Sequence, residues 1–419
     1  MRTIIKKILL AAPRPVRVCT VYTREFIFSF FCILWEKIAY PHLPKDIPFK
    51  TKNILIYNGD GALHSGTGKR LQLIANTLCD THTVHFMYSA QSNTQKRTNT
   101  LDPRIIQIEF NFSKIETNVP RRIFNMDPHI KEIIAKYKIS YLVVLGPGYA
   151  QYPWCTIKNI PIMLCTSFGA PSLQKNLAAV VYNSKTTQLH AEKWVGARNK
   201  RHTYYTPLSA WPENNTPELG LKLRKKLHIS ESSFVFGRIG RDDNNIYDPI
   251  GIKAFEKLQA SGTKDVHYII MSPPPLLVEY VHSNNIPNIH LIPPSGKEED
   301  IWAFHAALDS FAHFRRDGET SGVAIAESLA VGNPVISHKS IHWNSHLEYL
   351  DPAFSRIADI DNSDAYFEHM KEYVHIARNE KAQWNEMKKN AIVTAETNFS
   401  PKEYGKKMLA IIQKSTESI

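Results

Sequence analysis

The sequence lacks both a cysteine pattern and an apolar run long enough to cross a bilayer. Its five cysteines are an odd number without CxxC spacing, which argues against a disulfide framework and a structural zinc site. The strongest apolar run, Phe26 to Trp35, has about ten residues, half of the roughly 20 that a spanning helix needs. A cleaved signal is not expected, because Lys6 and Lys7 are followed by too few apolar residues before Pro13. The expected compartment is a reducing cytoplasm.

Composition excludes several further classes of protein. The chain has 419 residues, 43% of them hydrophobic and 21% charged, which is ordinary for a globular protein of two or three domains and unlike a disordered, collagenous or coiled-coil chain. Acidic residues are missing from the first 24 positions, where six bases supply half of the net charge of +12. These bases are Arg2, Lys6, Lys7, Arg14, Arg17 and Arg24.

This basic segment leads directly into the apolar run Phe26 to Trp35. One interpretation is a core helix or strand with a charged edge. The other is a membrane-surface anchor, in which aromatic side chains lie at the headgroup level and the upstream bases are attracted to anionic lipid. The second interpretation predicts that residues 1–40 attach the protein peripherally to an anionic membrane surface, at the inner face of the membrane.

Beyond Pro41, short apolar strands alternate with longer amphipathic stretches, which is typical of parallel α/β layers. The alternation restarts after Pro207 to Pro217, a segment whose prolines and turn formers predict a linker. The expected fold class is α/β, with two Rossmann-like doubly wound domains facing across a cleft, and a mostly helical end after Pro352. The expected strands are residues 53–57, 83–88, 105–110, 141–145, 160–165, 179–182, 203–206, 234–237, 266–271, 289–292, 310–313 and 334–337.

Three parts are therefore expected along the chain. Residues 1–50 form a basic and apolar appendage, residues 51–210 a first domain, and residues 211–399 a second domain. Open α/β sheets bind ligands outside the carboxyl ends of their strands. The site is thus expected among the loops that follow strands.

A glycine-rich loop follows the first expected strand. It does not match a Walker-type phosphate loop, because Leu63 and Arg70 replace the required residues, and it does not match GxGxxG, because His64 takes the third glycine position. What remains is a strand, a flexible loop and a helix whose amino end can meet an anion, with Gly61 allowing a ligand to approach the backbone closely. The alternative is a glycine-rich turn without a ligand.

The strongest motif lies in the second half, where a strand, a loop and a helix follow one another. Ser321 is expected to cap the helix, and the backbone amides of Gly322 and Val323 at its positive end can bind a diphosphate or a sugar oxygen. Glu327 on the helix can accept two hydrogen bonds from a ribose, and Glu319 on the loop can reach a hexose hydroxyl. The alternative is a pair of solvated carboxylates that flank a turn.

This motif resembles the donor-binding signature of the retaining glycosyltransferases of family 4, which have the two-domain GT-B fold. The resemblance extends over most of the chain, from about residue 52 to 415, and its most specific part is Glu319-x7-Glu327 together with SGVAIAESLAVGNPVI. It implies that Glu319 contacts the transferred sugar and Glu327 the ribose. It also implies that a final helix, residues 400–415, packs back on the first domain.

The segment FGRIGR, which contains Arg238 and Arg241, resembles the family's strand and loop in which an Arg and a later Lys hold the donor diphosphate. The later Lys is missing here, so Arg241 or Lys253 is the expected substitute. A His that faces the sugar in the family is also missing after the fifth strand. Ser167 or His64 is the expected substitute, with a loop-packing role as the alternative for His64.

The resemblance implies transfer of a hexose-type sugar from a nucleoside-diphosphate sugar, with retention of configuration and without a metal or cofactor. The acceptor would be a glycan, a lipid-linked molecule or a lipopolysaccharide-type molecule of polysaccharide biosynthesis. Arg238 or Arg241, with amides near Gly322, would stabilise the charge of the leaving diphosphate. Asp359 and Asp361 lie beyond the donor motif and are not expected to bind a metal.

Other functions remain open at this point. A nucleotide-sugar epimerase shares the same fold, and a phosphorylase would normally need a longer chain and a cofactor lysine. A basic nucleic-acid-binding protein is the alternative from a different class. Nucleic acid is not an expected partner, because the bases beyond position 24 are dispersed and no zinc or RNA-binding pattern is present.

Overall fold

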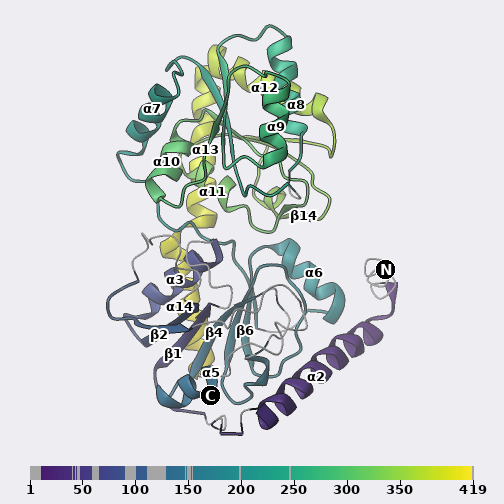
Figure 1. The fold of residues 1–419 in the computed structure, drawn as a ribbon, viewed down its shortest axis with the longest axis vertical. Coiled ribbons are helices and arrows are strands. Elements are labelled where there is room, and N and C mark those ends of the chain that lie inside the picture. Colours follow the sequence, from purple (N-terminus) through teal and green to yellow (C-terminus); the bar gives the residue numbers. More distant parts are fainter. Residues whose placement is uncertain are drawn as a thin grey trace. The chain divides into compact units, whose positions relative to one another are not determined.

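The structure is a computed structural model, which describes residues 11–39, 41–42, 44, 48–58, 66–89, 101–110, 129–146, 148, 152, 154–197, 200–244 and 247–417. The chain divides into two compact units. Unit 1 consists of Met1–Tyr205 and Lys402–Ile419, and unit 2 consists of Thr206–Pro401. Each unit is built around a parallel sheet packed against helices (Figure 1). The predicted α/β class with two doubly wound domains is therefore confirmed.

Unit 1 contains seven parallel strands in the order β3-β2-β1-β4-β5-β6-β7. The central strand β1 lies between β2 and β4, with Ile54 opposite Val84 on one side and Tyr141 on the other. Strand β4 is buried along its whole length and β1 along all but its first residue. This burial explains their unbroken apolar sequences, because a parallel sheet is covered on both faces. The strands are β1 (Asn53–Asn58), β2 (Thr83–Ser89), β3 (Ile106–Phe110), β4 (Tyr141–Gly146), β5 (Ile162–Thr166), β6 (Leu177–Tyr182) and β7 (Arg201–Thr203).

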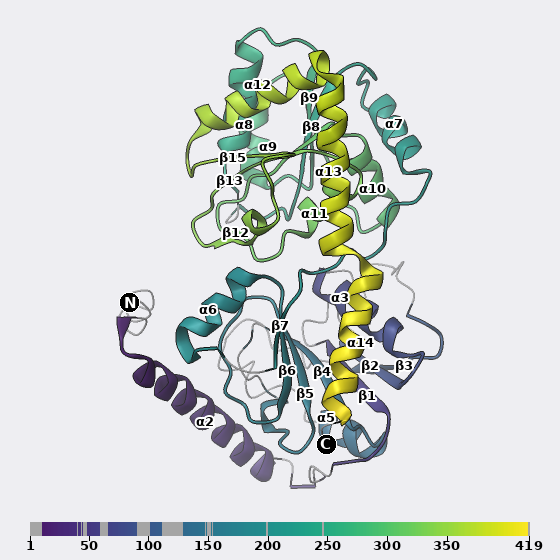
Figure 2. The ribbon, with the colours of Figure 1, turned by 180° about the vertical axis from the view of Figure 1, so that it is seen from behind.

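Helices form two apolar cores with this sheet. One core joins the sheet to α3 and α14, and there Arg70 Nε donates to the Tyr404 hydroxyl over 2.6 Å. Figure 2 shows α14 lying across this face of unit 1. The other core contains Ile130 and Ile134 of α5, Trp154 of η2 and Cys32 of α2. The helices are α2 (Arg14–Ala39), α3 (Gly66–Leu78), α5 (His129–Lys136), η2 (Trp154–Thr156), α6 (Lys185–Val195) and α14 (Pro401–Glu417).

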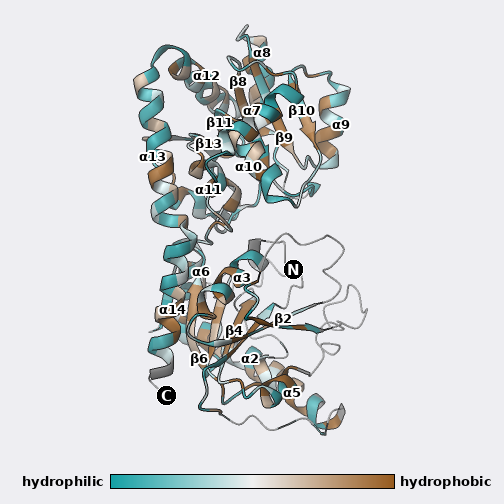
Figure 3. Ribbon diagram, turned by 90° about the vertical axis from the view of Figure 1, so that its left-hand side faces the viewer, coloured by the Kyte–Doolittle hydropathy of each residue, from teal (hydrophilic) through white to brown (hydrophobic). Residues whose placement is uncertain are grey.

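Unit 2 contains six parallel strands in the order β10-β9-β8-β11-β13-β15 and a short parallel pair, β12 with β14. Figure 3 shows the apolar strands in brown, with polar residues in teal on the helices. The strands are β8 (Phe234–Ile239), β9 (Val266–Met271), β10 (Ile289–Ile292), β11 (Ser310–Ala312), β12 (Gly318–Glu319), β13 (Val335–His338), β14 (Trp343–Asn344) and β15 (Ser355–Ala358). The helices are α7 (Thr216–Lys226), α8 (Ile250–Ala260), α9 (Pro275–Ser283), α10 (Glu298–Ala306), α11 (Val323–Ala330), η4 (Ser345–Glu348), α12 (Ser363–Asn379) and α13 (Lys381–Phe399).

The strand order reverses once in each sheet. In unit 2 the reversal lies at β8, which pairs with β9 on one side and with β11 on the other. Doubly wound sheets bind ligands at such a point, outside the carboxyl ends of the strands. The segments that follow β8, β11 and β13 meet at this edge of unit 2.

Two features of local structure go beyond the sequence-based expectations. The end of the chain after Pro352 is mostly helical, as predicted, but it also contains β15, which extends the sheet beside β13. The expectation that the run Phe26 to Trp35 is too short to cross a bilayer was wrong, because the run is part of the 26-residue helix α2, which by length and composition alone could cross one. The flanking polar residues hide this length from a search for apolar runs.

Candidate active site in unit 2

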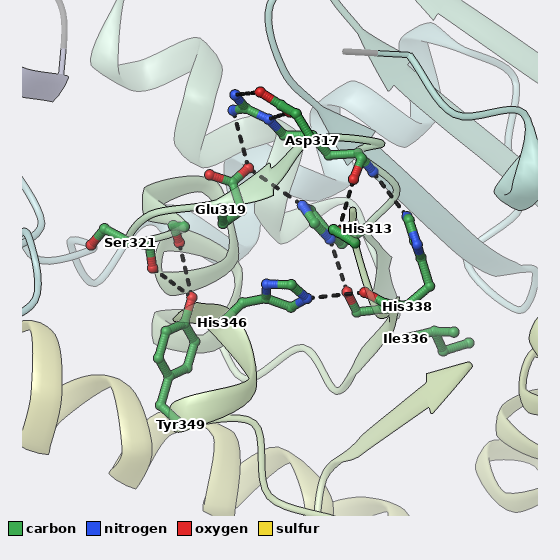
Figure 4. A network of polar contacts seen from close by, with 12 residues as sticks. His313, Asp317, Glu319, Ser321, Ile336, His338, His346 and Tyr349 are labelled. Atoms are coloured by element: carbon green, nitrogen blue, oxygen red, sulfur yellow. Dashed lines mark hydrogen bonds and ion pairs between the residues drawn. The ribbon is translucent and has the colours of Figure 1, made fainter. Parts of the chain in front are cut away.

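Glu319 follows the loop after β11 and is held by two nitrogen-bearing side chains (Figure 4). Its Oε1 lies 3.4 Å from His313 Nε2 and 3.4 Å from Arg315 Nη1. Arg315 is itself fixed by Asp317, with Nε and Oδ1 2.6 Å apart. Burial alone would raise the pKa of Glu319, but the hydrogen bond from His313 and the charge of Arg315 outweigh burial and lower this pKa to about 2. An ionised carboxylate, 18% exposed, thus remains accessible to a ligand hydroxyl.

His313 connects Glu319 to the sheet. While its Nε2 faces Glu319, its Nδ1 lies 2.9 Å from Ser337 Oγ at the next strand. The Tyr366 hydroxyl donates to the backbone carbonyl of His313 over 2.9 Å. Both ring nitrogens and the backbone are therefore engaged, and the orientation of the ring fixes the position of the carboxylate.

Two further histidines complete this polar network. His338 Nε2 accepts the backbone N–H of Arg315 over 3.1 Å, so its Nδ1 carries the proton and donates to the Lys339 carbonyl over 2.8 Å. His346 Nε2 donates to the backbone carbonyl of His338 over 3.1 Å (Figure 4). Burial, with the nearby His313, lowers the pKa of His346 to about 3, so this ring is neutral. The sequence motifs did not predict His313, His338 or His346 as site residues. His313 follows β11 and His338 ends β13, and this position at the end of a strand is the signal that could have identified them.

Arg238 lies near the end of β8 and is almost fully buried. Its guanidinium carbon lies 4.9 Å from the centre of the Phe314 ring, and its Nη1 has no hydrogen-bond partner among the described residues. Burial lowers the pKa of Arg238 to about 10, although the charge of Glu319 opposes this shift. Gly240 lies close by, and a Cβ there would stand 2.7 Å from Arg238 Nη2. A buried cation with an unsatisfied donor is suited to binding an anion.

The other two cations predicted at the diphosphate lie in a different environment. Arg241, on the loop after β8, is exposed, as is Lys253 on α8. Neither forms a pair with the Glu319 network. Among the three predicted cations, Arg238 alone is buried.

The start of α11 differs from the prediction. Gly322, and not Ser321, is the residue that caps the helix, with φ of 83° in the left-handed region. The Ser321 hydroxyl instead accepts the backbone N–H of Thr206 over 3.0 Å, and Tyr349 donates to the Ser321 carbonyl over 2.8 Å. The first N–H groups of α11, beginning with Val323, have no acceptor inside the helix and no side-chain cap.

Glu327 lies on α11 with a side chain that is 13% exposed. Its Oε2 is 3.3 Å from Nε2 of His305, a fully buried residue of α10. His305 Nδ1 has no hydrogen-bond partner among the described residues. The buried ring of His305 therefore fixes the position of the Glu327 carboxylate.

Further predicted residues lie elsewhere. His64 and Gly61 lie outside the described residues, and Ser167 follows β5 in unit 1. The carboxylates of Asp359 and Asp361 lie 2.6 Å and 3.2 Å from neighbouring basic side chains, so both form ion pairs. Within the described parts of the chain, no group of three or more His, Cys, Asp or Glu residues is placed to hold a metal ion.

No family model matches the chain, and no curated protein sequence matches it. Solved structures do match. A glycosyltransferase from Rickettsia africae is 16% identical, with a TM-score of 0.67, and the match covers 88% of this chain and 99% of that one. Anabaena Alr3699/HepE in complex with UDP and glucose is 14% identical, with a TM-score of 0.63, and covers 87% and 99% of the two chains.

WaaG, a glycosyltransferase involved in lipopolysaccharide biosynthesis, is 12% identical, with a TM-score of 0.60, and the match covers 85% of this chain and 99% of that one. These matches extend over both sheets and nearly the whole of each solved chain. Such low identity establishes the fold and leaves the activity to be argued from the site. The chain therefore has the two-domain GT-B fold that these solved structures share.

Proposed function

We propose that this chain is a glycosyltransferase that moves a sugar from a nucleoside-diphosphate sugar to an acceptor hydroxyl. The observation that carries the proposal is the arrangement where β8, β11 and β13 end. An ionised Glu319 lies there, together with a buried Arg238 that has an unsatisfied donor and the uncapped start of α11. The fold supports the proposal, because structures with this fold are described as glycosyltransferases and one of them was solved with UDP and glucose.

In this proposal Arg238 and the first amides of α11, at Gly322 and Val323, bind the donor diphosphate. Arg241 joins them from the loop after β8. Departure of the diphosphate is the difficult step, since negative charge develops on it. Fixed donors that already point at this charge lower the barrier without reorganisation. These groups supply the positive charge, so the proposed mechanism needs no metal and no cofactor.

The two glutamates position the rest of the donor. Glu319 accepts a hydrogen bond from a hydroxyl of the transferred hexose, and Glu327 accepts hydrogen bonds from the ribose. We propose retention of configuration, with the leaving phosphate taking the acceptor's proton on the same face of the sugar. We also propose that His64 faces the reaction centre.

The acceptor is proposed to be a glycan, a lipid-linked molecule or a lipopolysaccharide-type molecule of polysaccharide biosynthesis. The protein would act in the cytoplasm at the inner face of the membrane. Two observations support this part of the proposal. WaaG, which has the same fold, is described as involved in lipopolysaccharide biosynthesis, and the helix α2 is apolar enough to contact a membrane.

Donor binding can be tested with Glu327→Ala. A panel of nucleotide sugars is first screened for protection of the wild type against thermal unfolding, and the best donor is then titrated by calorimetry. Each hydrogen bond to a charged group contributes about 1.5–3 kcal/mol, so we expect the variant to bind about ten- to hundredfold more weakly. Glu279→Ala, an exposed glutamate of α9, should bind like the wild type.

Unchanged donor affinity in Glu327→Ala would remove the proposed ribose contact. If no nucleotide sugar protects the wild type, the proposed function itself fails. The product distinguishes the remaining possibilities, since nuclear magnetic resonance reports the anomeric configuration of the transferred sugar. Conversion of the donor sugar without any acceptor would favour an epimerase instead.

A further inference from the structure

Helix α2, drawn in purple in Figure 1, carries a row of exposed apolar side chains. Eight of the sixteen exposed large apolar side chains of the described residues belong to this one helix. The rings of Tyr22, Phe26 and Phe30 stack in a row with neighbouring centroids 6.3 Å apart, and Phe31 packs edge-on against Phe30 at 5.9 Å. Contiguous exposed patches of this kind mark binding surfaces. This outer face consists of Tyr22, Phe26, Ile27, Phe30, Phe31, Leu34 and Ile38.

The opposite side of α2 is fixed to unit 1 by two buried carboxylates. Glu25 Oε2 accepts the backbone N–H of Leu173 over 2.7 Å. Glu36 accepts hydrogen bonds from Lys131 Nζ over 2.6 Å and from the Thr156 hydroxyl over 2.9 Å. At about 3.6 residues per turn, Glu25 and Glu36 project away from the outer face. These hydrogen bonds therefore hold one side of α2 against the rest of unit 1.

The contacts of α2 with the rest of unit 1 limit the ways in which this helix can bind a membrane. By length and composition alone, the helix could cross a bilayer over Arg14–Ile38. A crossing helix would break its contacts with unit 1 and carry two carboxylates into hydrocarbon, where ionisable groups are costly. A helix that keeps these contacts offers only its outer face, so it can lie in the plane of the membrane surface.

A groove of about 660 Å³ lies beside the amino-terminal half of α2. Val18, Leu173 and Leu177 contribute apolar side chains to its lining, and two exposed lysines, Lys175 and Lys200, also line it. Its volume lies in the usual range for small-molecule sites. Apolar walls together with exposed ammonium groups suit an amphiphilic anion, in which a hydrocarbon chain is joined to a phosphate.

Charge identifies the partner of this surface. Helix α2 has no exposed carboxylate, because its only acids, Glu25 and Glu36, are buried. Its exposed bases are Arg14, Arg24 and Lys37. A second copy of the chain would bring the same positive charge to the contact, whereas anionic headgroups attract it.

We propose that α2 lies flat in the interface of an anionic phospholipid bilayer, with its outer face among the acyl chains and Lys175 and Lys200 at lipid phosphates. Aromatic side chains anchor such helices at the headgroup level, while bases add electrostatic attraction. One consequence of this inference rests on the proposed function, namely that the protein meets a lipid-linked acceptor at this side of unit 1. The lipid contact itself does not require any donor chemistry.

The experiment uses the full chain in a flotation assay. Vesicles of phosphatidylcholine alone are compared with vesicles of equal parts phosphatidylcholine and phosphatidylglycerol. We expect the wild type to bind only the anionic vesicles. Phe26→Ser with Phe30→Ser should reduce the bound fraction about tenfold or more, because buried apolar area is lost. Lys175→Glu with Lys200→Glu should weaken binding to the anionic vesicles and its dependence on salt.

Matched controls are exposed residues of unit 2. Leu221→Ser with Leu276→Ser, and Lys222→Glu with Lys225→Glu, should bind vesicles like the wild type. Absence of vesicle binding by the wild type, or equal binding by the outer-face variant, overturns the proposal. So does a dimer in light scattering that the outer-face variant abolishes, since a second copy would then cover the face.

Donor protection is measured on the same proteins, which keeps the two proposals separate. Each variant should retain the protection by nucleotide sugar that the wild type shows, which also establishes that it is folded. Vesicle binding without any donor protection would reject the proposed function and support the lipid surface. Donor protection without vesicle binding would support the proposed function and reject the lipid surface.

Discussion

Glu319→Gln tests whether unit 2 holds an ionised carboxylate in its polar network. The substitution keeps the shape of the side chain and removes its charge beside His313 and Arg315. The pKa of Glu319 falls from 4.5 to about 2, and each pKa unit corresponds to about 1.4 kcal/mol. The ionised form therefore contributes about 3 kcal/mol to the free energy of unfolding at pH 7.

The pH dependence follows from the direction of this shift. A lowered carboxylate pKa gives stability that is present above the unfolded pKa of 4.5 and is lost as the pH falls toward the folded value near 2. The free-energy difference between wild type and Glu319→Gln should thus be about 3 kcal/mol at pH 7, about 2.5 kcal/mol at pH 4 and about 1.5 kcal/mol at pH 3.

Urea unfolding by fluorescence measures this difference, and peptide-resolved hydrogen exchange identifies which transition belongs to unit 2, because two units need not unfold together. Glu279→Gln is the control, since this exposed glutamate of α9 should change the free energy of unfolding by less than about 0.5 kcal/mol. A loss below about 1 kcal/mol for Glu319→Gln at pH 7, or the same loss at pH 7 and pH 3, would refute the reasoning.

Two further substitutions test the packing around the site and around α14. Gly322→Ala should lower the stability in thermal unfolding by about 1–3 kcal/mol more than Gly262→Ala does. Both glycines have positive φ, but only at Gly322 would a Cβ collide with the Tyr349 hydroxyl. Equal losses of stability in the two variants would contradict this. Tyr404→Phe should lower the stability of unit 1 by about 1.5–3 kcal/mol, because buried Arg70 loses its acceptor; an unchanged urea midpoint would show that the bond adds nothing.

The sheets could be predicted well because their strands are buried on both faces. Such strands appear as apolar runs between turn signals, as at Tyr141–Gly146 and Val266–Met271. The edge strand Ser355–Ala358 was missed, because only two of its four residues are buried and it includes an arginine. An edge strand gains its pairing from a neighbour distant in sequence, here β13, which no local pattern reports.

The candidate site was predictable where its residues follow one another along the chain. Glu319 and Glu327 belong to a single strand, loop and helix, so their spacing carries the signal. The histidine network has no such spacing. It arises because β11 pairs with β13 with Ala312 opposite Ile336, which places His313 beside Ser337. Only the register of two distant strands brings these side chains together.

The start of α11 shows how a local rule can fail at a candidate site. A serine before a helix is expected to satisfy the first N–H groups with its hydroxyl, but Ser321 binds Thr206 and leaves the cap to Gly322. A capping hydroxyl would occupy donors that a diphosphate needs. With Ser321 turned away, the positive end of the helix keeps its N–H groups for an anion. Under the proposed function, the lost cap and the buried, unsatisfied Arg238 have one explanation, because a bound donor would supply hydrogen-bond acceptors to both.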